Sequence, residues 1–390
     1  MDDVSVFMSR PALRWLVPSA AAIAVIGGGA AAGTIVANAD PALPDRTAAQ
    51  LLVDLQSADV KGLSGTVVQN SDLGLPGIAG LLGKAGGTVS GGNPASLIAG
   101  SNTARVWYAG DEKVRLALLG TDGETDVIRN GSDVWVWNSG TNKATHVTLD
   151  GSSAKAGEHA RPESLPSSLP STPQEAADAA LAAIDSTTAV TTTGAAKVAG
   201  RDAYELVLSP RDTDSLVGQV RLAVDAEQHI PLRVDVYAKN TVKPAVRVAF
   251  EQISFGVPDA EQFTFNPPPG ATIDEKAAGD VAEEKASGSA AEKHAENKGE
   301  PSGKPETAGD GPKVIGKGWT SILTASLPKD SVAEAEKSEE AAPLVDTLEK
   351  VSGTWGSGRL LRGSLFSALI TDDGRVFAGA VTPEALYAVA

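Results

Sequence analysis

Four runs between residues 204 and 250 alternate between apolar and polar side chains. They read YELVLS, QVRLAVD, IPLRVDVY and VRVAF. Because successive side chains of a strand point to opposite faces, this alternation predicts an antiparallel sheet with one apolar face and one wet face. Burying one valine or leucine contributes about 1.5–3 kcal/mol, so the apolar face requires a cover.

The stretch Thr103–Leu149 predicts a second group of about five short strands. The breaks between its runs carry turn residues at Gly110-Asp111, Asp122-Gly123, Asn130-Gly131 and Ser139-Gly140. We expect Asn130-Gly131 to form a two-residue type I′ turn, which needs positive φ at both central positions. In the run VWVW, alternation places Trp135 and Trp137 on the same face. One further strand is predicted at Leu63–Asn70.

Two short helices are the nearest candidates to cover the apolar face. Pro44–Ser57 is amphipathic, with Asp45 as the expected N-cap and an apolar stripe at Ala48, Leu51, Leu52 and Leu55. The second helix begins with a capping box at Thr172-Pro173-Gln174-Glu175 and continues through an alanine-rich body. Leu73–Gly100 is an apolar, glycine-rich insertion. It predicts either a mobile lid over an apolar cavity or a loop packed on the domain edge.

The N-terminal segment Leu13–Val36 is nearly uncharged and long enough to span a bilayer. Ala37-Asn38-Ala39 then resembles a signal-peptidase site, so the segment is either an uncleaved anchor or a cleaved signal. In both cases Arg10 and Arg14 stay inside and the chain after Asp40 is exported. The predicted location is extracytoplasmic: membrane-associated if the anchor is kept, secreted if cleavage occurs near Ala39.

Composition divides the chain into four parts. After the N-terminal segment at 1–39, we expect one domain at 40–273, which ends near the proline-rich run NPPPG. Residues 274–313 are dominated by Ala, Glu, Lys, Gly and Pro and predict a disordered linker, because they bury too little to offset chain entropy. Residues 314–390 predict a small α+β unit with a hairpin across Thr371–Gly374 and a short helix after Thr382.

The sequence offers little for catalysis. The formal net charge is −16, which disfavours nucleic acid as a partner, because phosphate binding needs a basic face. The chain has no cysteine, which excludes disulfides and thiolate metal sites. It has only four histidines. No HExxH or GxSxG motif occurs. We therefore predict no enzyme activity, no metal site and no cofactor.

Five short motifs follow one another within residues 45–273: GLSGTVVQ, GSDVWVWNS, VAGRDAYELVLSP, VDAEQHIPLRVDVY and FTFNPPPGA. Behind a capped N-terminal helix, their order resembles the lipoprotein-carrier (LolA-like) family and its relatives, the RseB (MucB) sigma-factor regulators of actinobacterial type. The resemblance implies an α+β fold with an open, half-closed antiparallel β-barrel whose concave apolar face is covered by helices. It also implies binding of acyl chains or lipidated peptide rather than catalysis.

The candidate ligand contacts are large apolar residues of the two strand groups: Trp107, Leu116, Leu118, Trp135, Trp137, Leu206, Leu222, Val234 and Phe250. We expect them to line an apolar groove, because the one-sided sheet has too little helix to fill it. The alternative for the aromatic residues is ordinary core packing. The predicted function is binding of a lipid, an acyl chain or a lipidated protein. The alternative function is an RseB-like cell-envelope regulator that binds a membrane partner such as an anti-sigma factor.

Overall fold

The computed structural model describes residues 43–75, 99–120, 123–149, 186–277, 313–327, 334–338 and 342–390. The N-terminal segment, most of the apolar insertion, the second predicted helix and most of the predicted linker lie outside the described residues. Within the described ranges, no helix has the length and apolar character needed to cross a membrane.

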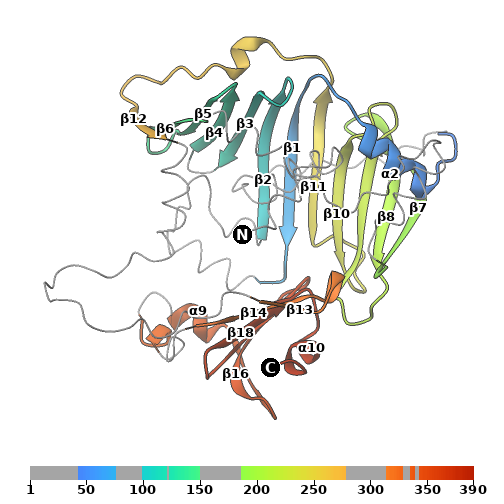
Figure 1. Cartoon of the computed structure of the whole chain (residues 1–390), viewed down its shortest axis with the longest axis vertical. Helices are drawn as coiled ribbons and strands as arrows, with labels where there is room; N and C mark the ends of the chain where they lie inside the picture. Colours follow the sequence, from blue (N-terminus) through green and yellow to red (C-terminus); the bar gives the residue numbers. More distant parts are fainter. Residues whose placement is uncertain are drawn as a thin grey trace, which may run out of the picture.

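The two predicted strand groups form one twelve-stranded sheet (Figure 1). From edge to edge its order is β12 (Thr272–Ala277), β6 (Lys143–Thr148), β5 (Asp133–Asn138), β4 (Gly123–Asn130), β3 (Lys113–Gly120), β2 (Ala99–Tyr108), β1 (Leu63–Asp72), β11 (Val246–Ser254), β10 (Pro231–Ala238), β9 (Val217–Asp225), β8 (Arg201–Pro210) and β7 (Thr188–Val198). Strand β1 joins the groups because it pairs with β2 on one side and β11 on the other. All pairs are antiparallel except β12 with β6, which is parallel.

The sheet is open, with β12 and β7 as its edges. Cα atoms of β7 and β11 nevertheless come within 8 Å of each other, although three strands separate them in the sheet. The sheet is therefore strongly coiled at this end. The expected large antiparallel sheet with few helices is confirmed, and the described residues do not close it into a barrel.

The apolar face can be followed across the strands by their register. Each residue in the following series is the cross-strand partner of the next, or lies two positions from it on the same strand: Leu118, Ala104, Val67, Phe250, Val248, Val234, Leu222 and Leu206. On β8–β11 the opposite face is polar, with linked ion pairs among Glu205, Arg221, Arg233, Asp235 and Arg247. The predicted division into an apolar and a polar face therefore holds for these strands, but the polar face is only partly wet, because Val207, Asp235 and Tyr237 on it are buried.

Helix α2 (Ala48–Ser57) covers one end of the apolar face and lies in front of β8 in Figure 1. Its N-cap is Thr47, whose side chain accepts from the backbone N–H of Gln50, while the Gln50 side chain accepts from the backbone N–H of Thr47. The expected N-cap, Asp45, is wrong, because this reciprocal box is formed two residues later. Leu51 is fully buried against Leu206 and Leu222.

The C-terminal residues form a second sheet of six strands. Its order is β13 (Lys313–Ile315), β14 (Ile322–Ser326), β18 (Arg375–Gly379), β17 (Ser367–Thr371), β16 (Gly356–Arg362) and β15 (Glu349–Gly353), accompanied by η2 (Gly318–Thr320), α9 (Ala342–Asp346) and α10 (Pro383–Tyr387). The hairpin and the terminal helix expected from the sequence are both present. The core of this unit consists of Ile322, Leu360, Leu369, Phe377, Val381 and Leu386.

The two sheets are joined by main-chain hydrogen bonds. The N–H of Leu216 donates to the carbonyl of Ala380 at 2.8 Å, and the N–H of Ser364 donates to the carbonyl of Leu73 at 2.8 Å. The Trp319 indole N–H also donates to the Thr188 hydroxyl at 2.7 Å. The C-terminal unit therefore packs on the end of the large sheet, as Figure 1 shows.

Two local features differ from the sequence-based expectation. Asn130 pairs with Asp133, so the central turn residues are Gly131 and Ser132, and only Gly131 has positive φ (64°). Positive φ at the first central position alone is the requirement of a type II′ turn rather than a type I′ turn. In addition, β12 continues the large sheet to Ala277, past the expected domain end at residue 273.

Candidate functional site

The nine candidate ligand contacts lie on two different faces of the large sheet. Six of them share the apolar face: Leu116, Leu118, Leu206, Leu222, Val234 and Phe250. The three tryptophans lie on the other face, because Trp107 is the partner of Arg115 and Trp135 the partner of Ile128. Arg115 and Ile128 lie one position away from the residues that share a face with Leu116. Because side chains alternate along a strand, Arg115, Ile128 and their tryptophan partners lie on the opposite face. A ligand on the apolar face would therefore be separated from the indole rings by the sheet itself.

Cover of the apolar face is uneven. At the β8–β9 end, Leu206 and Leu222 are buried beneath α2. Farther along, Leu118 is buried in a cluster with Val67, Ala104 and Val248, but Leu116, Val106 and Phe250 beside it are only half-buried. We call this second part the β3–β11 face and define it by Leu116, Leu118, Val106, Val248 and Phe250. At the α2 end Leu208 and Val234 are half-buried as well, and Val106 and Phe250 also pack against a cluster that contains Leu63 and Leu232.

A small polar cluster shares this face at the other end of β1 and β2. Gln69 and Asn102 are cross-strand partners, and both are almost completely buried. The Asn102 amide donates to the Gln69 side-chain oxygen, and the Gln69 amide donates to the hydroxyl of Ser71. Buried polar groups of this kind retain their hydrogen bonds because leaving them unpaired is costly. The apolar face therefore ends in a fixed group of amides.

The tryptophan face is covered by the segment that follows β11. This segment contains the short helix η1 (Ala260–Phe263), where Phe263 is 1% exposed. The Phe265 ring lies 4.9 Å from the ring of Trp135 and 6.3 Å from that of Trp137, measured between ring centroids. Protein therefore contacts both half-buried rings on the side away from the apolar face.

A buried ion pair lies beneath the same segment. Arg115 Nη2 is 2.6 Å from Asp126 Oδ2, and the Arg115 guanidinium lies 5.1 Å above the Trp107 ring. Burial raises the pKa of Asp126 to about 6, against the lowering effect of Arg115 and with a further increase from Glu124. This carboxyl group is therefore poised to titrate close to neutral pH.

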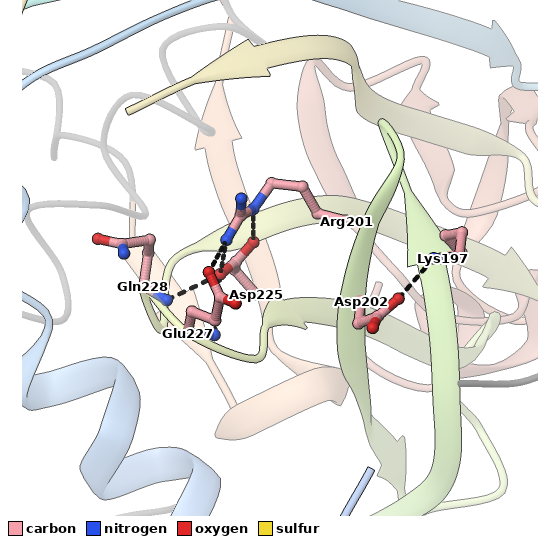
Figure 2. Close-up of polar contacts among 6 residues, drawn as sticks. All are labelled: Lys197, Arg201, Asp202, Asp225, Glu227 and Gln228. Carbon is pink, nitrogen blue, oxygen red and sulfur yellow. Dashed lines mark hydrogen bonds and ion pairs between the residues drawn. The ribbon is translucent and has the colours of Figure 1, made fainter. Parts of the chain in front are cut away.

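A second buried carboxylate organises the β9–β10 turn (Figure 2). Asp225 is fully buried and accepts from Arg201 and from the backbone N–H groups of Glu227 and Gln228, the latter two at 2.9 and 2.7 Å. Burial alone would raise the pKa of Asp225, but these hydrogen bonds outweigh it, and the pKa lies below its usual value. The contacts fix the turn and the start of β8, which is a structural role.

Sequence reasoning missed both buried carboxylates, because each occupies a polar position in an alternating strand. The only available signal was the position of Asp225 directly before a turn, where Asp commonly bonds the backbone two residues on. Across the described part of the chain, no group of three or more His, Cys, Asp or Glu residues is arranged to hold a metal ion.

Residues 98–267 match the family model of the MucB/RseB N-terminal domain. Over this range the chain is similar to the MucB/RseB N-terminal domain. This confirms the resemblance drawn from the order of the sequence motifs. The matched range begins one residue before β2, contains β3–β11 and η1, and therefore includes all nine candidate contacts.

Solved structures show distant similarity to this chain. A MucA/MucB complex from Pseudomonas aeruginosa is 16% identical, covering 88% of this chain and 96% of that chain with a TM-score of 0.39. A LolA superfamily protein from Nitrosomonas europaea is 11% identical, with coverage of 57% and 99% and a TM-score of 0.21. An uncharacterized conserved protein from Thermus thermophilus is 10% identical, with coverage of 58% and 98% and a TM-score of 0.31. No curated protein sequence matches the chain.

Proposed function

We propose that the protein binds an acyl chain, of a lipid or of a lipidated protein, on its β3–β11 face and catalyses no reaction. The observation that supports this most directly is the presence of half-buried apolar side chains on this face. Helix α2 buries Leu206 and Leu222, whereas Leu116 and Phe250 stay half-buried. Apolar surface of this kind, with a few fixed polar groups at one end, is typical of small-molecule sites.

The size of the effect is compatible with reversible binding. Each methylene moved from water to an apolar surface contributes about 0.8 kcal/mol, so about ten methylenes on this face would contribute roughly 8 kcal/mol. That figure corresponds to about micromolar affinity, before the entropy cost of association is subtracted. Such a protein would hold its ligand and also release it.

Binding of a fluorescent acyl probe to the purified protein tests the proposal. Leu116→Gln is expected to weaken probe binding by roughly tenfold, because removing one buried leucine contact loses about 1.5 kcal/mol. Leu323→Gln is the matched control, since Leu323 is 47% exposed on β14 of the other sheet. Equal affinities for the two variants, or no displaceable binding by the wild type, would contradict the proposal.

The second candidate function is an RseB-like regulator of the cell envelope that binds a membrane protein such as an anti-sigma factor. The family match over residues 98–267 favours it. Both candidates place the protein outside the cytoplasm, held at the membrane if Leu13–Val36 is an uncleaved anchor. N-terminal sequencing of the mature protein tests that anchor, because a protein that begins at Asp40 has lost it.

The same two variants distinguish the candidates. For the second, the membrane partner should co-purify with the detergent-solubilised protein, and Leu116→Gln should leave that capture unchanged. If Leu116→Gln loses both partner capture and probe binding, both ligands depend on the β3–β11 face. An absence of any captured membrane protein from the native host would count against the regulator function.

A further inference from the structure

His146 of β6 lies between two carboxylates that come from different strands. Its Nδ1 is 2.7 Å from Glu275 of β12, and its Nε2 is 2.9 Å from Asp133 of β5. A neutral imidazole carries only one N–H, so it can donate to only one of the two carboxylates. Both contacts are hydrogen bonds together only when the ring is the doubly protonated imidazolium.

The surroundings of the ring favour this charged form. The Trp135 indole stacks on it with 4.1 Å between ring centroids and an interplanar angle of 10°, which suits a cation over an aromatic face. Asp133 and Glu275 are the charged groups bonded to it, from β5 and β12. Burial lowers the pKa of His146, but the hydrogen bonds to Asp133 and Glu275 outweigh it, so the pKa lies above its usual 6.5.

Strand β12 has one neighbour in the large sheet, β6, and pairs with it along its whole length. It is an edge strand of six residues, paired in parallel with β6 alone, and residues 272–275 are exposed. Glu275 is the direct cross-strand partner of His146. Among the described residues, the bond between these two side chains is therefore a charge-assisted link between β12 and β6.

We propose that His146 is a pH-dependent latch, which holds β12 on the sheet when protonated and releases it when neutral. The proposal is independent of the acyl-chain function, because His146 is on the tryptophan face. The sign follows from linkage: a group whose pKa is raised in the latched state favours that state at low pH, and the effect is lost as pH rises through that pKa. Release exposes the backbone groups of β6 that β12 had paired.

Hydrogen exchange of the purified full chain between pH 5 and 8.5 tests the latch. Protection of the β12 amides, corrected for the intrinsic pH dependence of exchange, should fall as His146 deprotonates. Protection should fall about tenfold for each unit by which the pKa of His146 in the latched state exceeds its pKa in the released state. Amides of β8 and β9, inside the sheet, should stay protected throughout and report that the fold is intact. NMR titration of the His146 ring, assigned with His146→Gln, gives its pKa in parallel.

Two variants on one strand separate the latch from a general effect of charge. Glu275→Gln should lower the His146 pKa and flatten the pH dependence of β12 protection. Asp274→Asn removes a carboxylate from the neighbouring position, which points to the opposite face, and should behave as the wild type. His146→Gln should make β12 protection independent of pH. The proposal is wrong if wild-type β12 protection is constant across the His146 titration, or if Glu275→Gln keeps the wild-type dependence.

Discussion

Replacing Asp225 by asparagine is expected to be one of the more damaging single changes in the large sheet. The carboxylate is 0% exposed and lies at the end of β9 (Figure 2). Removing one partner of a buried ion pair costs about 3–5 kcal/mol, because the other charge is left uncompensated. Here the amide oxygen can still accept from Glu227 and Gln228, and Arg201 keeps its 2.8 Å contact to Glu227. We therefore expect a loss near the lower end, about 3 kcal/mol.

Asp202→Asn is the matched control and lies in the same view. Asp202 pairs with Lys197 at 2.7 Å, but their side chains are 43% and 37% exposed. Exposed pairs contribute about 0–1 kcal/mol, so this variant should unfold almost as the wild type does. The comparison isolates burial, since both variants convert a paired aspartate to asparagine.

Urea unfolding followed by tryptophan fluorescence and far-UV circular dichroism gives the two free energies, provided that the transitions coincide. Because the pKa of Asp225 is lowered in the folded protein, its contribution is present at neutral pH and is lost as pH falls through the folded pKa. The difference between wild type and Asp225→Asn should therefore shrink in acid. A loss no larger than that of Asp202→Asn would refute the reasoning.

Three further predictions concern the interior of the large sheet. Asp126→Asn should remove one component of the pH dependence of stability. Because the pKa of Asp126 is raised in the folded protein, its contribution to the free energy of unfolding declines as pH rises from about 4 through about 6. Urea unfolding of both proteins at several pH values would detect the difference. Leu51→Ala should lower the free energy of unfolding by about 3 kcal/mol or more, because Leu51 is 0% exposed and fills the space between α2 and the sheet. A negligible change in a thermal melt would mean that α2 is loosely attached. Trp135→Ala and Trp137→Ala should each lower the free energy of unfolding by about 3 kcal/mol and leave the affinity for the acyl probe unchanged. Loss of probe binding by a variant that remains folded would place the ligand on the tryptophan face.

Local alternation in the sequence was enough to predict β8–β11, because each strand carries its own pattern. It could not predict that the two strand groups share one sheet. That depends on β1 pairing with β2 and with β11, and the β11 partner lies more than 170 residues away from β1 in the chain. Long-range pairing leaves no local signature in a single sequence.

The division of the candidate site has a similar cause. The sequence correctly placed Trp135 and Trp137 on one face, since they are two positions apart. Whether that face is also the face of Leu116 depends on the register between β3, β4 and β5, and a shift of one residue reverses the answer. The N-cap at Thr47 was missed because Asp45 is an equally good capping residue type, and only the reciprocal bond with Gln50 decides between them.

The two ends of the large sheet bear on how the protein avoids aggregation. An edge strand offers unpaired backbone groups to any other chain, and natural sheets block this with bulges or charges. At β7 the register shifts between Thr192 and Ala195, and Gly194 has a φ of 109°, so the edge is bent where its residues are exposed. At β12 the consecutive carboxylates Asp274 and Glu275 are exposed and would have to lose water before a second chain could pair. As long as β12 stays in place, both edges of the twelve-stranded sheet therefore oppose the addition of a strand from another copy of the chain.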